Sequence, residues 1–170
     1  MHPPEFLSGQ LLEWGERSLR DLPWRVTRNP WEILVAEVML QQTTVERVSR
    51  RWSQFLSRFP TPESCASSSP SEVIVEWSGL GYNRRALNLH RCAVELVERH
   101  GGRVPKRLEH LLALPGVGPY TARAVMAFAF GQDVGVLDVN VGRILARWSG
   151  RPLKPAEAQE LADGSVPSGQ

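Results

Sequence analysis

The segment Leu114-Pro-Gly-Val-Gly118 decides how this 170-residue sequence is interpreted, because it separates two helical patterns. Leu111 and Leu112 precede it, and the apolar repeat of 119–130 follows it. Two glycines two positions apart allow a tight backbone turn that brings amide N–H groups close to a ligand. Pro119 favours the first turn of the next helix, whose positive end points the same way. This geometry suits a phosphate, although a plain turn between two helices has the same pattern.

Outward from this hairpin (108–130), the apolar spacing is helical almost throughout. It predicts further helices from Leu7 to the Leu22-Pro23 break and at about 31–40, 45–59, 70–79, 84–100, 107–113 and 139–149. Short segments rich in glycine and proline separate them. Only Val134–Leu137 resembles a strand, and it is too isolated to build a sheet. The predicted fold class is therefore all-α.

Composition excludes several classes of protein. Hydrophobic residues make up 42% and charged residues 22%, which is typical of a globular chain and not of a disordered one. No apolar stretch approaches the roughly 18 residues of a membrane span, and the first residues lack a secretory pattern, so a cytoplasmic location is expected. Cys65 and Cys92 match no zinc or iron–sulfur spacing and are expected to be buried, reduced thiols.

The basic residues are unevenly distributed, although the formal net charge is only +2. All but Lys106 and Lys154 are arginines, the better planar donors to phosphate; a GC-rich genome would produce the same bias. One segment carries Glu95 and Glu98 against seven basic residues, at positions 84, 85, 91, 99, 103, 106 and 107. This local excess is typical of a nucleic-acid footprint.

Two acidic residues stand among apolar neighbours. Glu37 interrupts the apolar run of 31–40, where a charge is costly unless it is hydrogen-bonded or functional. Asp138 follows Val134–Leu137 and precedes a predicted helix. Structural roles are open for both, since Glu37 could lie on a polar helix stripe and Asp138 could be an N-cap. Tyr82, in a glycine turn before two arginines, could enter a base stack or lie in the core.

Five segments share an order and spacing with a known family. They are Asp21–Arg25, Glu37–Thr43, Trp77–Tyr82 with Asn88–His90, Leu114–Ala122, and Leu137–Val141 with Arg143. Over roughly 5–150 the chain resembles the helix-hairpin-helix DNA glycosylases of the endonuclease III superfamily (HhH-GPD), most closely the MutY-type adenine glycosylases. The resemblance implies one catalytic region, with a six-helix core at about 22–135 and a second helical lobe from 1–21 and 136–170.

The resemblance also implies roles in DNA binding. The amides of Gly116 and Gly118 would hold a backbone phosphate while the target nucleotide is rotated out of the duplex. Residues that match Gln42 and Tyr82 fill the gap in the stack, with Leu80 nearby. The resemblance assigns further contacts with DNA or the base pocket to Gln41, Arg20, Trp24 and Arg25.

The catalytic roles follow from the same resemblance. Glu37 matches the acid that protonates adenine, and its apolar surroundings fit a raised pKa. Asp138 matches the carboxylate that stabilises the oxocarbenium ion or transiently bonds to the sugar, and Asn140 would orient the site. Bifunctional relatives carry at position 120 a lysine that forms a Schiff base. Tyr120 cannot form one, so a monofunctional glycosylase without strong lyase activity is expected.

The sequence departs from this family at its C-terminus. Relatives continue with helices and four cysteines that ligate a [4Fe–4S] cluster. This chain has only two cysteines, so no cofactor is expected in it, and a C-terminally shortened fold is predicted. The missing helices would leave some of Phe6, Leu7, Leu11 and Trp14 uncovered, at a cost of roughly 1.5–3 kcal/mol each.

The expected function is excision of a mispaired base, most simply adenine opposite guanine or 8-oxoguanine, in double-stranded DNA. Gln41, Gln42 and the segment Gly79–Tyr82 favour adenine over the alternative, a thymine or uracil glycosylase acting on T·G or U·G mismatches. A non-catalytic DNA-binding remnant is a further alternative, against which the retention of both Glu37 and Asp138 argues. A helical adaptor without a DNA role would require all five segments to match by coincidence.

Overall fold

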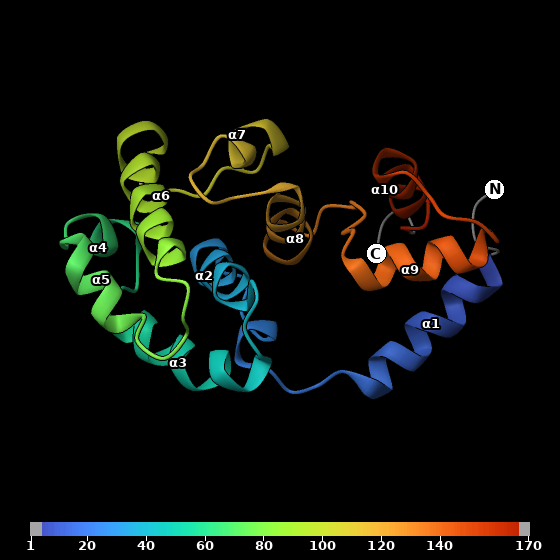
Figure 1. The fold of residues 1–170 in the computed structure, drawn as a ribbon, viewed down its shortest axis with the longest axis horizontal. Coiled ribbons are helices and arrows are strands. Elements are labelled where there is room, and N and C mark those ends of the chain that lie inside the picture. Colours follow the sequence, from blue (N-terminus) through green and yellow to red (C-terminus); the bar gives the residue numbers. More distant parts are fainter. Residues whose placement is uncertain (1–4, 167–170) are drawn as a thin grey trace. The chain divides into compact units, whose positions relative to one another are not determined.

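The computed structural model describes the backbone of residues 5–166 and the side chains from residue 9 onward. Within that range all regular structure is helical and there is no strand (Figure 1). The helices form two compact units, one of Leu22–Phe130 and the other of Met1–Asp21 with Gly131–Gln170. The all-α prediction is confirmed, and Val134–Leu137 has no regular structure.

The larger unit contains a 3-10 helix and seven α-helices. They are η1 (Pro23–Arg25), α2 (Pro30–Leu40), α3 (Val45–Arg58), α4 (Pro62–Ala66), α5 (Pro70–Glu76), α6 (Arg84–His100), α7 (Leu108–Leu112) and α8 (Pro119–Phe130). The predicted helices of this unit are all present. Helices η1 and α4 were not predicted, because three or five residues are too few to show an apolar repeat.

Helix α2 lies at the centre of the larger unit and packs against α3, α6 and α8. Asn29 caps its N-terminus by accepting a hydrogen bond from the Trp31 amide at 3.0 Å. From Trp31 to Met39 every residue except Glu32 is buried, as the nearly continuous apolar run predicts. A helix that is apolar on all sides is stable only when other helices cover it on all sides.

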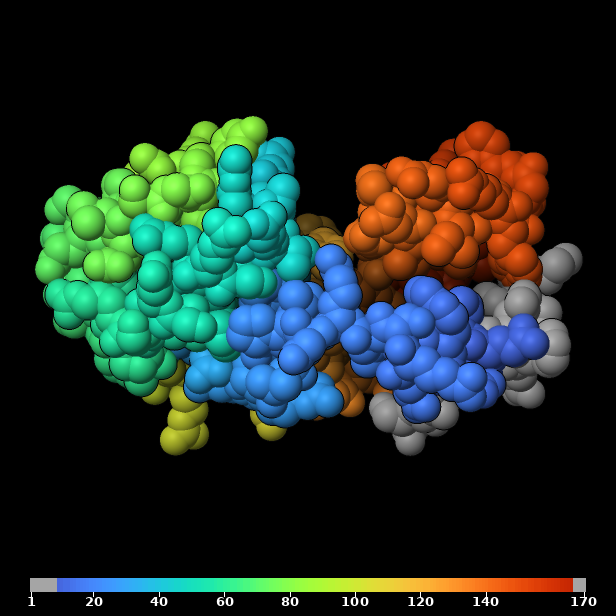
Figure 2. Space-filling view, turned by 90° about the horizontal axis from the view of Figure 1, so that it is seen from below, coloured from blue at the N-terminus to red at the C-terminus, as the bar shows by residue number. Residues whose placement is uncertain are grey.

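Helix α3 shows the opposite pattern, with one apolar stripe and a polar face. Val48, Trp52 and Phe55 are buried, whereas the arginines and serines between them face outward or lie at the margin of the core. In the space-filling view α3 forms much of one face of the larger unit (Figure 2). The predicted amphipathic helix is therefore confirmed.

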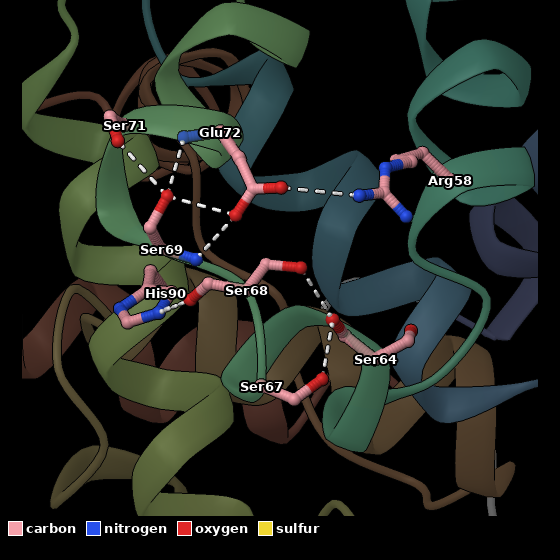
Figure 3. Close-up of polar contacts among 8 residues, drawn as sticks. All are labelled: Arg58, Ser64, Ser67, Ser68, Ser69, Ser71, Glu72 and His90. Atoms are coloured by element: carbon pink, nitrogen blue, oxygen red, sulfur yellow. Dashed lines mark hydrogen bonds and ion pairs between the residues drawn. The ribbon is translucent and has the colours of Figure 1, made fainter.

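Serine side chains organise the connection from α4 through α5 (Figure 3). Ser69 and Glu72 form a capping box at the start of α5, and Arg58 pairs with Glu72 at 3.3 Å. The nearly buried His90 of α6 donates from Nε2 to the carbonyl of Ser68 at 2.8 Å. The His90 hydrogen bond ties α6, whose first turn belongs to the candidate site, to the segment between α4 and α5.

The smaller unit contains α1 (Glu5–Ser18), α9 (Val139–Trp148) and α10 (Pro155–Asp163). Helix α10 was not predicted, because its buried face consists of small residues such as Ala158 and Ala162. Gly135 lies so close to α10 that an added Cβ would stand 2.4 Å from the carbonyl carbon of Ala162. Its amide donates to Asp163 Oδ1 at 2.8 Å, so the segment before α9 is held against α10.

Leu11 and Trp14 of α1 are 63% and 67% exposed. Phe6 and Leu7 lie outside the described side chains. No helix among residues 5–166 has the length and apolar character needed to cross a membrane.

Candidate active site and DNA-binding loops

Glu37 is a buried carboxyl in the middle of α2, with only 5% of its surface exposed. Burial disfavours the charged form and raises the pKa of Glu37 to about 7, while a hydrogen bond with Tyr120 acts in the opposite direction. Its Oε2 atom is buried and has no hydrogen-bond partner among the described residues. The position of Glu37 therefore suits a group that carries a proton near neutral pH.

Tyr120 reaches Glu37 from the first turn of α8, which packs against α2. A second contact joins the same helices, because Gln41 donates from Nε2 to Thr121 Oγ1 at 3.2 Å. Gln41 is half-buried, so its amide contributes to packing between α2 and α8. The larger unit thus brings Glu37, Tyr120 and Gln41 together beside the hairpin.

The hairpin Leu114–Gly118 connects α7 and α8, as predicted. Gly116 has a φ of 79°, and an added Cβ would lie 2.8 Å from the Cβ of Asn88 in α6. Gly118 faces open space, so a ligand could approach its backbone. Among residues 5–166 no group accepts a hydrogen bond from the amides of Gly116 and Gly118. These amides and the N-terminus of α8 together form a candidate phosphate site.

Asp138 caps α9 in the smaller unit. Its Oδ1 atom accepts from the amides of Asn140 at 2.9 Å and Val141 at 2.7 Å. The Asn140 side chain donates to the other oxygen, Oδ2, at 3.0 Å. The N-cap interpretation is therefore correct, and these three donors fix the orientation of the Asp138 side chain at the N-terminus of α9. Asp138 and Glu37 belong to different units.

Two exposed loops of the larger unit carry unusual backbone. Gln42 and Tyr82 have φ values of 56° and 49°, and no other non-glycine residue within 5–166 has a positive φ. Such a conformation is disfavoured for residues with a side chain and persists only where the surroundings enforce it. Gln42 is exposed, and Tyr82 is 65% exposed. Both side chains are therefore accessible, and Tyr82 is not a core residue.

Several other predicted contact residues lie differently. Leu80 is only 3% exposed, so its side chain belongs to the core and is not available to enter a base stack. Trp24 is also buried, with its ring 6.2 Å from that of Trp52 in an edge-on arrangement. Arg20 and Arg25 are exposed, the first in the smaller unit and the second in η1 of the larger one.

Arg85 was predicted to belong to the basic surface segment, and this is wrong. It is buried, whereas the other six basic residues between 84 and 107 are exposed. Its guanidinium donates instead to both exposed loops, at Thr43 Oγ1 and the Leu80 carbonyl. The helical repeat could have indicated this, because Arg85 lies four residues before the buried Leu89 on the apolar face of α6.

The residues present do not fit an iron–sulfur cluster, which requires four thiolates where cysteine is the only ligand type. Cys65 and Cys92 are buried and unpaired, and burial raises the pKa of each thiol to about 12. Their burial is as predicted, and the raised pKa keeps both thiols protonated at neutral pH. Within 5–166 no group of three or more His, Cys, Asp or Glu side chains could hold a metal ion.

The fold and the helix-hairpin-helix site define a class of DNA repair proteins. A family model described as HhH-GPD superfamily base excision DNA repair protein matches residues 35–167. The chain belongs to this superfamily.

Individual relatives show to which kinds of glycosylase the chain is similar. The chain is 49% identical over 146 residues to the adenine DNA glycosylase of Mycobacterium tuberculosis, a match that covers 85% of this chain and 48% of the relative. It is 43% identical to the human adenine DNA glycosylase, over 94% of this chain and 33% of that protein. The chain thus spans about half the length of the mycobacterial relative and less of the human one.

Three further matches cover more of the other protein's length than these do. The thymine/uracil-DNA glycosylase of Methanothermobacter thermautotrophicus is 34% identical, over 97% of this chain and 77% of its own length. A solved thermostable thymine-DNA glycosylase matches with a TM-score of 0.90 at 32% identity, covering 97% and 79% of the two chains. A trapped covalent complex of endonuclease III with DNA matches with a TM-score of 0.83 at 25% identity, covering 96% and 76%. The predicted glycosylase fold is confirmed.

Proposed function

We propose that the chain hydrolyses the N-glycosidic bond of adenine mispaired with guanine or 8-oxoguanine in double-stranded DNA. The observation that carries this proposal is the buried Glu37 carboxyl, whose pKa near 7 leaves it protonated in a large fraction of molecules at neutral pH. A proton donor of this kind is what a departing base requires. The adenine DNA glycosylases at 49% and 43% identity support adenine as the base.

Binding begins at the DNA backbone in this proposal. The amides of Gly116 and Gly118 and the positive end of α8 would hold one phosphate without reading sequence. The adenine must then leave the stack, because the glycosidic bond is inaccessible within the duplex. Gln42 and Tyr82, which project from exposed loops, would occupy the space that it vacates.

The chemistry requires an acid at the base and an anion at the sugar. Glu37 would donate its proton to adenine as the C1′–N bond breaks and the bonding electrons leave with the base. Asp138, held by its three donors, would stabilise the positive charge on the sugar, with Asn140 fixing its orientation. Water would then add to C1′ and return a proton to Glu37.

The product would be an intact strand with an abasic site. Tyr120 has no amine with which to form a Schiff base, so β-elimination through this position is not available. Its hydrogen bond to Glu37 would instead hold the acid in place. The reaction would take place in the compartment that contains the chromosome, which in a bacterial cell is the cytoplasm.

The test uses duplexes that contain A·8-oxoguanine, A·G, T·G or U·G, incubated with purified protein and then treated with alkali. Scission only at adenine is the expected result, with loss of scission but retention of binding in Glu37→Gln and Asp138→Asn. Strong scission without alkali would contradict the assignment of Tyr120. Binding without scission would identify a non-catalytic DNA-binding protein.

A second candidate is a thymine or uracil glycosylase for T·G and U·G mismatches. It is favoured by the 34% identical relative, of which the chain covers 77%, and by the thymine-DNA glycosylase structure with its TM-score of 0.90. Scission at thymine or uracil in the same assay would identify the chain as this second kind of glycosylase.

We also propose that the activity of these residues requires no bound cofactor. Both thiols are buried, and among the described residues neither belongs to a group of three or more His, Cys, Asp or Glu side chains that could hold a metal ion. Purified protein should contain no stoichiometric iron by elemental analysis and should keep its activity in the presence of a chelator.

A further inference from the structure

The guanidinium of Arg85 joins the two loops that carry the positive-φ residues. The α2–α3 loop covers residues 41–44, and the α5–α6 loop covers 77–83. Both lie within the larger unit. Arg85 donates from Nη1 to the carbonyls of Val38 (3.1 Å), Met39 (2.8 Å) and Gln41, and from Nη2 to Thr43 Oγ1 (2.8 Å) and the carbonyls of Leu80 (3.0 Å) and Gly81 (3.1 Å).

The first group of acceptors is the carboxyl end of α2. The last carbonyls of a helix have no partner within the helix and carry the negative end of its dipole. A buried cation at this position therefore satisfies carbonyl groups that would otherwise be exposed or unpaired. Only arginine offers several donors in one rigid plane, so that a single side chain can serve acceptors on two sides.

The second group of acceptors belongs to the turn that presents Tyr82. The guanidinium carbon lies 5.6 Å from the centre of the Tyr82 ring and 5.4 Å from that of Trp77. Trp77 itself donates from Nε1 to the Gly81 carbonyl at 3.1 Å. The carbonyl before Tyr82 is thus held by Trp77 and Arg85, and the Tyr82 carbonyl accepts from the Arg85 amide at 2.9 Å, so these contacts help to keep Tyr82 in its disfavoured conformation.

Thr43 completes the connection. Its hydroxyl accepts from Arg85 and lies 3.3 Å from the Leu80 carbonyl, across the two loops. Gln42 stands between Gln41 and Thr43, both of which contact Arg85. Arg85 and Thr43 therefore join the residues on either side of Gln42 to Leu80 and Gly81, the two residues before Tyr82, so the two loops are held to each other.

We propose that Arg85 is a positioning residue for DNA recognition, which locks the two loops into one rigid wedge so that Gln42 and Tyr82 enter the base stack together. Preorganisation of this kind lowers the entropy lost when the loops meet distorted DNA. The benefit falls on lesion-containing DNA, which opens a gap for the wedge, and not on intact duplex. This role rests on the proposed function, since it assumes that the loops meet duplex DNA.

The test compares Arg85→Lys with Arg50→Lys in the full chain. Lysine keeps the positive charge but loses the planar fork, and Arg50 is an exposed arginine of α3 outside both loops. Two quantities are measured at a temperature where each protein is folded. One is the affinity ratio between a duplex with a tetrahydrofuran abasic analogue and the intact duplex. The other is the fluorescence of 2-aminopurine placed beside the analogue, which reports unstacking.

Arg85→Lys is expected to lower the affinity ratio about ten- to a hundredfold, the effect of losing one or more hydrogen bonds from a charged group. It should also reduce the fluorescence at saturating protein, whereas Arg50→Lys should change neither. A folded Arg85→Lys protein with a lower melting temperature but an unchanged ratio and fluorescence would overturn the proposal, because Arg85 would then be only structural. If Arg85→Lys does not fold, the same two measurements are made on Thr43→Val. This variant removes only one acceptor of Arg85, so the expected decreases in affinity ratio and fluorescence are smaller.

Base excision by the unmodified protein separates this inference from the proposed function. Excision together with unchanged discrimination in Arg85→Lys contradicts the role of Arg85 alone. Preferential binding of the abasic duplex without excision contradicts the proposed chemistry alone, and the effect of Arg85→Lys on the ratio still decides the inference. An unmodified protein with no preference for the abasic duplex would contradict both.

Discussion

At the scale of single residues, the environment of Glu37 determines what its carboxyl can do. The side chain lies in a helix whose other central residues are apolar, and one carboxyl oxygen has no partner within the described chain. Ionisation at this position costs free energy, so the proton is retained to about neutral pH. The same burial that makes Glu37 a proton donor also makes its charged form a source of instability.

The first prediction concerns stability and pH. In the folded chain the pKa of Glu37 is about 7, against 4.5 for the unperturbed group. The folded state therefore holds the proton more tightly, and this contribution of about 3 kcal/mol is complete below pH 4.5 and lost as the pH rises through 7. Melting temperatures between pH 5 and 8.5 should fall less steeply for Glu37→Gln than for the unmodified protein. Parallel curves would contradict the raised pKa.

The second prediction concerns the pH dependence of base excision. Because Glu37 must be protonated to act, single-turnover rates should decline as the pH rises above about 7. Glu37→Gln should lower the rate by about 10²–10⁴-fold, the usual contribution of a general acid. Asp138→Asn serves as the comparison, since its loss of rate should not remove the pH dependence that Glu37 causes. A rate independent of pH between 6 and 9 in the unmodified protein would exclude Glu37 as the acid.

At the scale of elements, the packing of the hairpin between α7 and α8 against α6 depends on one of its two glycines, Gly116. Gly116 combines a positive φ with a close approach to Asn88, whereas Gly118 has neither constraint. Two glycines that look equivalent in the motif therefore have different tasks. The first shapes the turn against α6, and the second leaves its backbone open to a ligand.

The third prediction separates these tasks by thermal unfolding. Gly116→Ala must place a Cβ 2.8 Å from the Cβ of Asn88 in a left-handed conformation, so its stability should fall by about 1–3 kcal/mol. Gly118→Ala has open space and an ordinary φ, so its melting temperature should stay within a degree or two of the unmodified value. Equal losses in the two variants would show that the hairpin is not packed on α6 through Gly116.

At the scale of the whole molecule, the chain forms two units with unequal connectivity. The larger unit is one continuous segment with its own buried aromatic core, which includes Phe55, Phe59 and Trp77. The smaller unit combines the segments that precede and follow the larger unit in the sequence, and it contains Asp138. Glu37 and the hairpin belong to one unit and the aspartate to the other, so the proposed chemistry requires both.

The fourth prediction follows from this division. A fragment of residues 22–130 should keep its helical circular dichroism and unfold in one cooperative transition, because its core is local to the segment. It should bind duplex DNA through the hairpin and both loops, but it should excise no base because it lacks Asp138. The full chain with Asp138→Asn is the matched control and should show the same loss of excision. Excision by the fragment would remove Asp138 from the mechanism.

Much of the architecture follows from local sequence. Three features each depend only on residues that are neighbours in the sequence: the apolar run of α2, the apolar stripe of α3, and the glycine and proline residues of the hairpin. All three predictions are confirmed. Helices α4 and α10 were missed for a physical reason. A five-residue helix and one whose buried face is mostly alanine leave no strong periodicity, so capping residues and tertiary contacts alone define them.

By itself the sequence determined the all-α class, the hairpin, and which carboxyls and loop residues are candidates for chemistry. Only the tertiary structure decided the environments of the side chains, because burial depends on residues far apart in the chain. It placed Leu80 in the core, gave Tyr82 an exposed left-handed backbone, and turned Arg85 from a surface charge into the link between two loops. The sequence shows that a residue is charged, but it does not show whether water or buried polar groups surround the charge. The neighbours in space decide this, and with it the pKa and the hydrogen bonds of the side chain.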